Sequence, residues 1–156
     1  AYTAYRVKSP IVPGELEKIV IAKDEYKKKL SCSGTTIPDP LQLTTGWIGE
    51  KEGIKHWPKV TYGDILLYFR DKRGLKTCDV LNRYKEGKAY SYFQCDFVKE
   101  VQIYLLKNQC LLRTSVTPSQ NLRHEAYQVW AWLRMPEGNI LSASCSCTAG
   151  WVKDSQ

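Results

Sequence analysis

The spacing of apolar residues changes from a helical period in the N-terminal half of the chain to alternation in the C-terminal half. Over residues 15–30, apolar side chains recur at helical spacing with Glu and Lys between them, which predicts an amphipathic helix. A second helix is predicted from about Tyr62 and ends in the charged residues before Gly74. A third, shorter helix is predicted over residues 79–84.

Beyond Gly87, apolar and polar residues alternate, as they do in strands that bury one face. The predicted strands are 101–105, 111–116, 127–134 and 140–147, with turns at 108–109 and 136–139. The predicted class is therefore α+β, with a helical N-terminal half and an antiparallel sheet of three or four strands in the C-terminal half.

The whole chain, residues 1–156, is predicted to form a single domain. Its length and its hydrophobic content of 43% are sufficient to bury one core. Within the domain, residues 1–97 are predicted to be mostly helix and loop, residues 98–147 to form the sheet, and residues 145–156 to hold half of a zinc motif.

A long loop is predicted from Ser31 to Pro58, where the chain is rich in Gly, Pro and Thr. Trp47 and Trp57 lie within this stretch. We expect both tryptophans to anchor the loop to the core.

Positive charge exceeds negative charge, because the chain has 23 Lys and Arg against 16 Asp and Glu, a net charge of +7. This balance favours an anionic partner, and nucleic acid before a membrane, because no basic amphipathic helix with a clean apolar face is evident. A solvated basic surface explains the charge equally well. No signal peptide is visible, no apolar run approaches the ~20 residues that span a bilayer, and the six cysteines are sparse, so an intracellular protein is expected.

Basic residues concentrate between Phe69 and Lys88, where seven cations stand against three carboxylates. They fall at the ends of the second and third predicted helices, where side chains can reach phosphates. These candidate nucleic-acid-binding residues are Arg70, Lys72, Arg73, Lys76, Arg83, Lys85 and Lys88. A charged helical surface without a ligand is the alternative interpretation.

Trp130 and Trp132 share one face of a predicted strand, and Arg134 follows two residues later. Aromatic side chains beside an arginine can stack on unpaired bases. A tryptophan pair also has a large area to bury, so packing in the core is the preferred expectation.

No catalytic motif is evident in the chain. It contains no glycine-rich phosphate loop, no HExxH pair and no GxSxG elbow. His56 and His124 are expected to be ordinary surface or loop residues. The chain is therefore predicted not to be an enzyme.

Cys145-Ser146-Cys147 places two thiolates at the end of the last predicted strand, as in half of a structural zinc site. A closed site needs four ligands, and no Cys or His follows Cys147, so the metal site is incomplete. The remaining cysteines are Cys32, Cys78, Cys95 and Cys110. The first three are expected in helices or loops, and any of the four could contribute a further ligand.

A resemblance to a known family covers residues 41–151. The residues that carry it are, in order, 46–47, 57–60, 63–65, 89–93, 111–113, 116–120, 129–130, 138–143 and 145–150. Their order resembles the N-terminal region of animal proteins that join a SWIM-type zinc finger to a YqaJ-type viral recombinase nuclease domain, many of them of transposon or viral descent. In that family the finger reads Cys-X-Cys, a spacer and Cys-X-His, and the first half matches Cys145 and Cys147. The Cys-X-His half and the nuclease domain are absent from this sequence.

The resemblance implies a non-catalytic module that binds nucleic acid, with DNA expected, in a nuclear protein. Zinc is implied as a cofactor of a longer parent and is expected to bind this fragment weakly or not at all. The rival hypothesis is a protein-interaction or oligomerisation module, in which tryptophans and tyrosines form an apolar interface. A regulatory domain of the nuclease is a third hypothesis.

Overall fold

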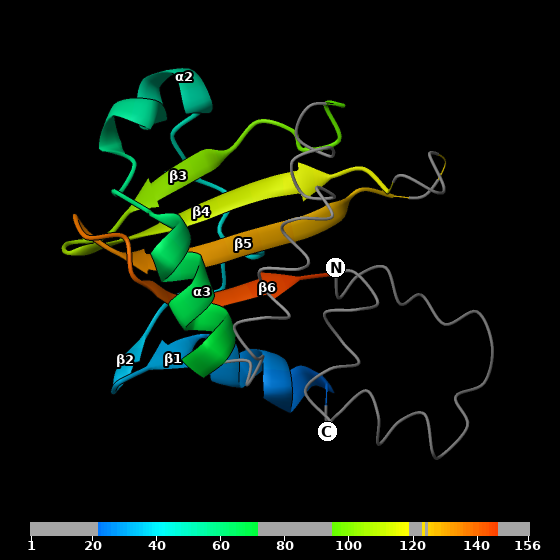
Figure 1. The fold of residues 1–156 in the computed structure, drawn as a ribbon. Helices are drawn as coiled ribbons and strands as arrows, with labels where there is room; N and C mark the ends of the chain where they lie inside the picture. The colour runs from blue at the N-terminus through cyan, green and yellow to red at the C-terminus, as the bar shows by residue number, and fades with distance from the viewer. Residues whose placement is uncertain (1–21, 72–94, 119–122, 124, 147–156) are drawn as a thin grey trace, which may run out of the picture.

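The computed structural model describes residues 22–71, 95–118, 123 and 125–146 of the chain. At its centre is a four-stranded antiparallel sheet (Figure 1). Its strands are β3 (Gln102–Leu105), β4 (Gln109–Val116), β5 (Tyr127–Arg134) and β6 (Ile140–Cys145). Each strand pairs with the next one along the chain, so the order across the sheet is β3-β4-β5-β6. The predicted α+β class is confirmed.

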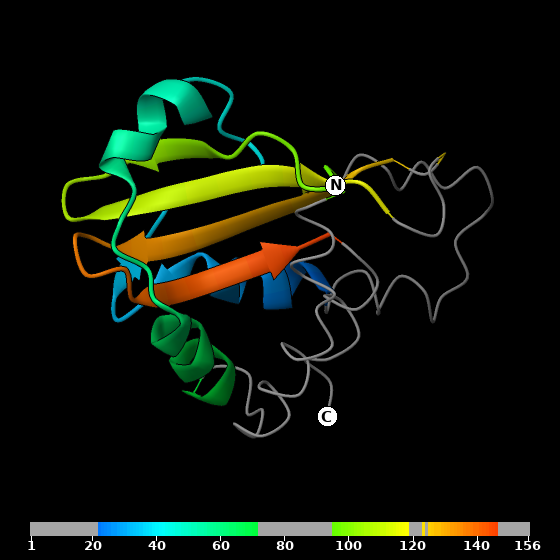
Figure 2. The same ribbon diagram turned by 45° about the horizontal axis from the view of Figure 1, so that its top comes forward.

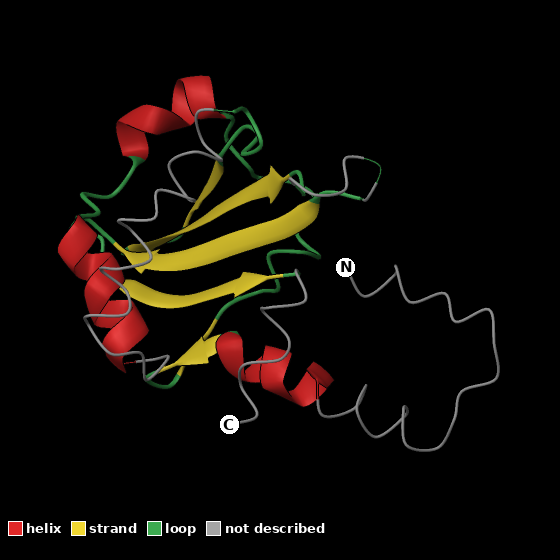
Figure 3. Cartoon of the chain, turned by 45° about the vertical axis from the view of Figure 1, so that its right-hand side comes forward, coloured by secondary structure: helices red, strands yellow, loops and turns green. Residues whose placement is uncertain are grey.

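Helices and a small hairpin precede the sheet in the chain. Residues 22–29 are helical, and beside them lies the hairpin of β1 (Ser31–Cys32) and β2 (Thr35–Thr36) (Figure 3). Next come α2 (Glu50–Gly53), the 3-10 helix η2 (Ile54–His56) and α3 (Tyr62–Asp71). In the part of the chain that the structure describes, no helix is both long enough and apolar enough to cross a membrane.

Two turns of the sheet lie at the same end, because consecutive hairpins of a meander alternate between its ends. The turns are residues 106–108 and 135–139, and together we call them the turn end. A main-chain hydrogen bond joins them, from the N–H of Met135 to the carbonyl oxygen of Asn108 over 2.8 Å. The two hairpins therefore hold each other in a fixed position.

Both faces of the sheet are buried. The first face carries Trp130, Trp132 and Leu111, which form a cluster with Ile37 from the loop after β2. Tyr26 packs against this cluster from the N-terminal helical segment (residues 22–29), and Leu30 does so from the turn directly after it. The segment lies behind the sheet in Figure 2. The alternation of β5 explains this arrangement, because residues two apart in a strand point to the same face.

The second face carries a smaller cluster of Ile103, Cys110 and Leu133. Ile48 and Trp57 pack against it from the segment that contains α2 and η2. Trp47 packs against the cluster on the first face. The prediction that both tryptophans anchor the segment from Ser31 to Pro58 is therefore confirmed, with one tryptophan on each face.

Three sequence predictions need correction. The stretch from Ser31 to Pro58 is not a continuous loop, since it contains β1, β2, α2 and η2. Cys32 accordingly lies in a strand, not in a helix or loop. The turn predicted at Asn108-Gln109 comes one residue earlier, because Gln109 already pairs with Arg134. The helix predicted over 79–84 lies outside the described residues, as does the first part of the helix predicted over 15–30.

Candidate nucleic-acid interface and metal half-site

Trp130 and Trp132 are core residues, as preferred from the sequence. Their exposed fractions are 1% and 0%, so neither indole face is open to a nucleic-acid base. Each indole nitrogen has a partner inside the protein: Trp130 Nε1 donates to the hydroxyl of Tyr26 over 3.1 Å, and Trp132 Nε1 donates to Gln109 Oε1 over 2.9 Å. Buried tryptophans with satisfied N–H groups stabilise the fold, so neither of these two side chains provides a surface on which a base could stack.

Trp47 is held by polar and cationic contacts at the edge of the first face. The guanidinium carbon of Arg113 lies 4.0 Å from the centroid of the Trp47 ring, a cation–π contact. Arg113 also donates to the carbonyl oxygen of Leu43 and to Gln102 Oε1, over 2.9 and 2.8 Å. Partial burial lowers the pKa of Arg113 from its usual value. These contacts engage two of the five N–H donors of Arg113 and hold its guanidinium on the Trp47 ring, which gives Arg113 a structural role at this edge.

Cys145, the first cysteine of the half-motif, is the last residue of the edge strand β6. It lies opposite Val129 in the register of β5 and β6 and is half-buried. Just beyond it, the N–H of Ser146 donates to the carbonyl of Gln128, and Ser146 Oγ accepts from the Gln128 N–H, both over 2.9 Å. Two hydrogen bonds thus fix the backbone where the motif begins. Cys147 lies outside the described residues.

Cys110 cannot share a metal ion with Cys145. Cys110 pairs with Leu133 and Cys145 pairs with Val129, so the two cysteines are four residues apart along β5, about 13 Å at ~3.3 Å per residue. They also lie on strands separated by β5, which adds two strand spacings of ~4.8 Å. Two sulfurs bound to one zinc at ~2.3 Å each are less than about 5 Å apart.

Cys32 lies on the other side of the sheet from Cys145. It packs in the cluster on the first face, whereas Cys145 stands opposite Val129, whose side chain alternates with Trp130 and belongs to the second face. Among the described residues there is no group of three or more Cys, His, Asp or Glu side chains that could hold a metal ion. Cys78, like Cys147, lies outside them.

Arg70 is the one member of the predicted basic segment that the structure describes. It is exposed near the end of α3, with its Nε donating to Asp71 Oδ1 over 2.8 Å. The pKa of Arg70 is raised, mainly by that hydrogen bond and secondly by the negative charge of Asp71. Arg70 therefore starts the basic segment on the surface but is neutralised in part by its neighbour. The other six candidate residues, Lys72, Arg73, Lys76, Arg83, Lys85 and Lys88, lie outside the described residues.

The structure brings together three further cations that the sequence analysis did not select. Lys107 lies in the turn between β3 and β4, and Arg134 is the last residue of β5. Lys59 lies beside the turn between β5 and β6, to which its N–H is hydrogen-bonded. We call these three residues the turn-end cations. A sequence signal existed for two of them, because Lys107 directly precedes one predicted turn and Arg134 ends the predicted strand before the other, but no pattern places Lys59 beside them.

Comparisons of the chain with protein-family models, with curated proteins and with solved structures found no match.

Proposed function

We propose that this domain is a non-catalytic module that binds nucleic acid, with DNA as the expected ligand, in a nuclear protein of the SWIM and recombinase-nuclease type. The observation that carries the proposal is the charge density of residues 69–88, with seven cations against three carboxylates. The described residues, in contrast, hold 13 Lys and Arg against 11 Asp and Glu, so they account for little of the net charge of +7. An excess this local attracts an anionic polymer more strongly than the same charges dispersed over the surface.

The burial of the sheet tryptophans supports a backbone-binding mode. With Trp130 and Trp132 in the core, these two side chains contribute no base stacking, which favours a mode in which cations bind phosphates. Binding of this kind is weakly selective for sequence and strongly dependent on salt.

Zinc would be bound by Cys145 and Cys147 together with ligands from elsewhere in a longer parent. The two thiolates fit one half of a tetrahedral site, and the edge strand β6 fixes the first of them. When bound there, zinc would stabilise a closed finger next to the sheet and supply no reactive chemistry.

The test is DNA binding of the whole chain, measured by fluorescence anisotropy with a labelled duplex at several salt concentrations. Charge reversal in the variant R73E/K76E/R83E should abolish binding at moderate salt, and should lower the salt slope by about 0.9 for each phosphate that is no longer neutralised. The control variant K23E/K27E/K51E makes the same change of net charge at exposed lysines of the N-terminal helical segment and α2. If R73E/K76E/R83E binds with the affinity and salt slope of the unmodified chain, the basic segment is not the site.

A protein-interaction module is the second candidate function, and one exposed apolar side chain on each of α3 and η2 favours it. Leu67 on α3 is 44% exposed, and Ile54 on η2 is 58% exposed. No α3 side chain is among those described in either core cluster. Sedimentation over a range of concentrations tests this candidate: a mass that rises with concentration in the unmodified chain but not in Leu67→Glu supports it, and a constant monomer mass excludes self-association.

A further inference from the structure

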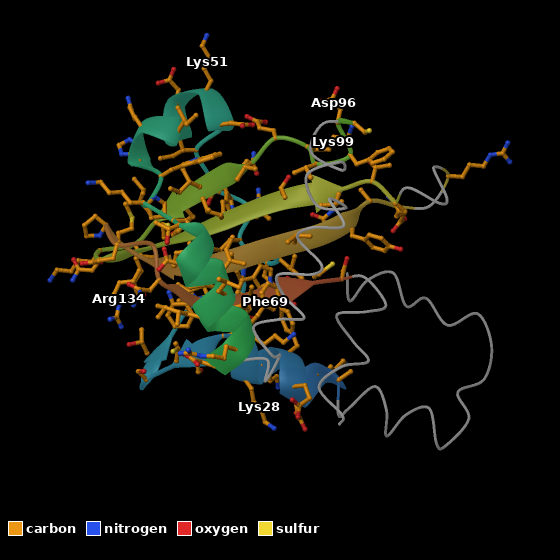
Figure 4. The ribbon with its side chains drawn as sticks, in the orientation of Figure 1. Lys28, Lys51, Phe69, Asp96, Lys99 and Arg134 are labelled. Atoms are coloured by element: carbon orange, nitrogen blue, oxygen red, sulfur yellow. The ribbon has the colours of Figure 1, made fainter. Side chains whose placement is uncertain are left out.

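Three cations from separate parts of the sequence meet at the turn end of the sheet. Lys59, Lys107 and Arg134 are all exposed. In Figure 4, Arg134 extends outward from this end of the sheet, whereas Lys99 and Asp96 lie at the opposite end. None of the turn-end cations belongs to the basic segment of residues 69–88.

Main-chain hydrogen bonds bring these residues together. Arg134 faces Gln109 across the β4–β5 pair, and the next residue, Met135, donates to the carbonyl of Asn108. Arg134 directly precedes Met135, and Lys107 directly precedes Asn108, so this hydrogen bond holds the backbones of the two cations close together. The N–H of Lys59 donates to the carbonyl of Pro136 over 3.0 Å, which adds the third cation to the group.

Gly138 allows this close approach. A Cβ atom at Gly138 would lie 2.7 Å from the nitrogen of Val60 and 2.8 Å from the carbonyl carbon of Lys59. The backbone φ of Gly138 is +90°, a conformation that residues with a side chain rarely adopt. The segment that carries Lys59 can thus lie directly against the turn because residue 138 has no side chain.

The turn-end cations have no counter-charge among the described residues. Two other surface lysines are paired, Lys28 with Glu25 at 2.9 Å and Lys55 with Glu52 at 3.8 Å. Within the described part of the chain, no ion pair includes Lys59, Lys107 or Arg134. Glu137 is the single carboxylate in the two turns themselves. Three exposed cations with one nearby carboxylate leave a net positive charge at this end, where an external anion can bind.

We propose that Lys59, Lys107 and Arg134 form a second site for nucleic acid, which binds the phosphates of a duplex backbone. This inference rests on the proposed function and adds a surface to it. The ligand is the backbone rather than unpaired bases, because no aromatic side chain described at this end is exposed: Trp57 is half-buried and Trp132 is fully buried. Three cations on a rigid hairpin end suit a duplex, whose phosphates are fixed in space and densely charged.

The experiment compares the whole chain with two triple variants of equal charge. K59Q/K107Q/R134Q neutralises the proposed site and leaves its main-chain hydrogen bonds in place, and K23Q/K27Q/K51Q removes three exposed charges elsewhere. Binding of a labelled duplex is measured from about 50 to 200 mM salt. We expect the salt slope of the first variant to fall by about 0.9 per phosphate, close to three in total, and the second variant to keep the slope of the unmodified chain. Circular dichroism melting of both variants shows whether they fold.

The outcomes can be told apart. If K59Q/K107Q/R134Q folds and keeps the salt slope of the unmodified chain, the second site is wrong, and the proposed function stands as long as R73E/K76E/R83E loses binding. If the unmodified chain itself does not bind the duplex at about 50 mM salt, both proposals fall. A single strand of the same length serves as the last comparison: binding of the single strand tighter than of the duplex would overturn the assignment of a duplex backbone.

Discussion

Tyr26 and Trp130 are joined by a hydrogen bond although 104 residues separate them in the chain. The hydroxyl of Tyr26 accepts from Trp130 Nε1 and donates to Asp39 Oδ1 over 2.6 Å, and the two rings meet edge to face with centroids 6.2 Å apart. Asp39 Oδ1 also accepts from the N–H of Leu41 over 2.9 Å. A single hydroxyl thus ties the N-terminal helical segment and the loop after β2 to the sheet.

Tyr26→Phe should destabilise the domain by about 1–3 kcal/mol, because it leaves the buried indole N–H of Trp130 without its acceptor. Urea unfolding followed by tryptophan fluorescence measures the effect. Tyr104→Phe is the matched control, since the Tyr104 ring packs on Trp47 but its hydroxyl makes no hydrogen bond within the described residues. Equal losses in the two variants would contradict the role given to the Tyr26 hydroxyl.

Trp132→Ala should reduce the free energy of unfolding by ~3–5 kcal/mol, because it empties a fully buried site and leaves Gln109 Oε1 without its donor. A loss of this size approaches the whole stability of many domains, so partial unfolding at room temperature is expected. Thermal melting by circular dichroism provides the measurement, with Leu67→Ala on the surface of α3 as the control. A variant that keeps its melting temperature and loses DNA affinity would show that Trp132 serves binding instead.

Gly138→Ala should destabilise the domain more than Gly34→Ala, although both glycines have positive φ angles, +90° and +78°. At Gly34 an added Cβ meets nothing within 4 Å, so only backbone strain of about 1 kcal/mol is expected. At Gly138 the Cβ also meets the backbone of Lys59 and Val60 at less than 3 Å, and the total should reach about 2–4 kcal/mol. Chemical denaturation measures the loss of unfolding free energy in each variant. Equal losses would show that the backbone of Lys59 and Val60 does not pack tightly against Gly138.

Burial raises the pKa of the Cys110 thiol from 9.0 to about 11, which sets a pH window for its effect on stability. As the pH rises above 9, the unfolded chain loses this proton while the folded protein keeps it. The contribution of Cys110 to stability is therefore complete below pH 9 and declines between pH 9 and 11. The difference in unfolding free energy between the unmodified chain and Cys110→Ala, measured by urea unfolding at several pH values, should shrink over this range.

Zinc should be held weakly by the chain, because Cys145 and Cys147 leave at least two coordination positions to water. Metal analysis after dialysis should find well under one zinc per chain, and Cys145→Ser should lower the amount further. One zinc per chain that resists dialysis would contradict this prediction. Such a result would assign the missing ligands to residues other than Cys110, which is too far from Cys145 to share a metal ion with it.

Local sequence patterns were sufficient for the sheet and for α3. Alternation in β5 predicted which residues share a face, and the turn residues 136–139 predicted the hairpin to β6. The segment from Ser31 to Pro58 was harder to predict, since two-residue strands and one-turn helices are too short to show a period. What stabilises these short elements is contact with the sheet, such as that of Ile37 with the first face, and a local pattern cannot display it.

The candidate site was less predictable than the fold. The sequence identified a dense basic segment, of which Arg70 is the described part, but it could not place Lys59 beside Lys107 and Arg134. That grouping depends on a main-chain bond between residues 59 and 136 and on the missing side chain at Gly138. A count of charges along the sequence does not show which charged residues are brought together by tertiary contacts.

The outer edge of β3 is covered by Ile48, which precedes α2, and by Glu50, the first residue of α2. The N–H and carbonyl groups of Ile103 that point away from β4 both bond to Ile48, over 3.0 and 2.8 Å, and the N–H of Val101 donates to Glu50 Oε2. An exposed strand edge is a template on which another chain can add a strand and begin aggregation. By pairing with Ile103 in the same molecule, Ile48 prevents another chain from adding a strand at the β3 edge of the sheet.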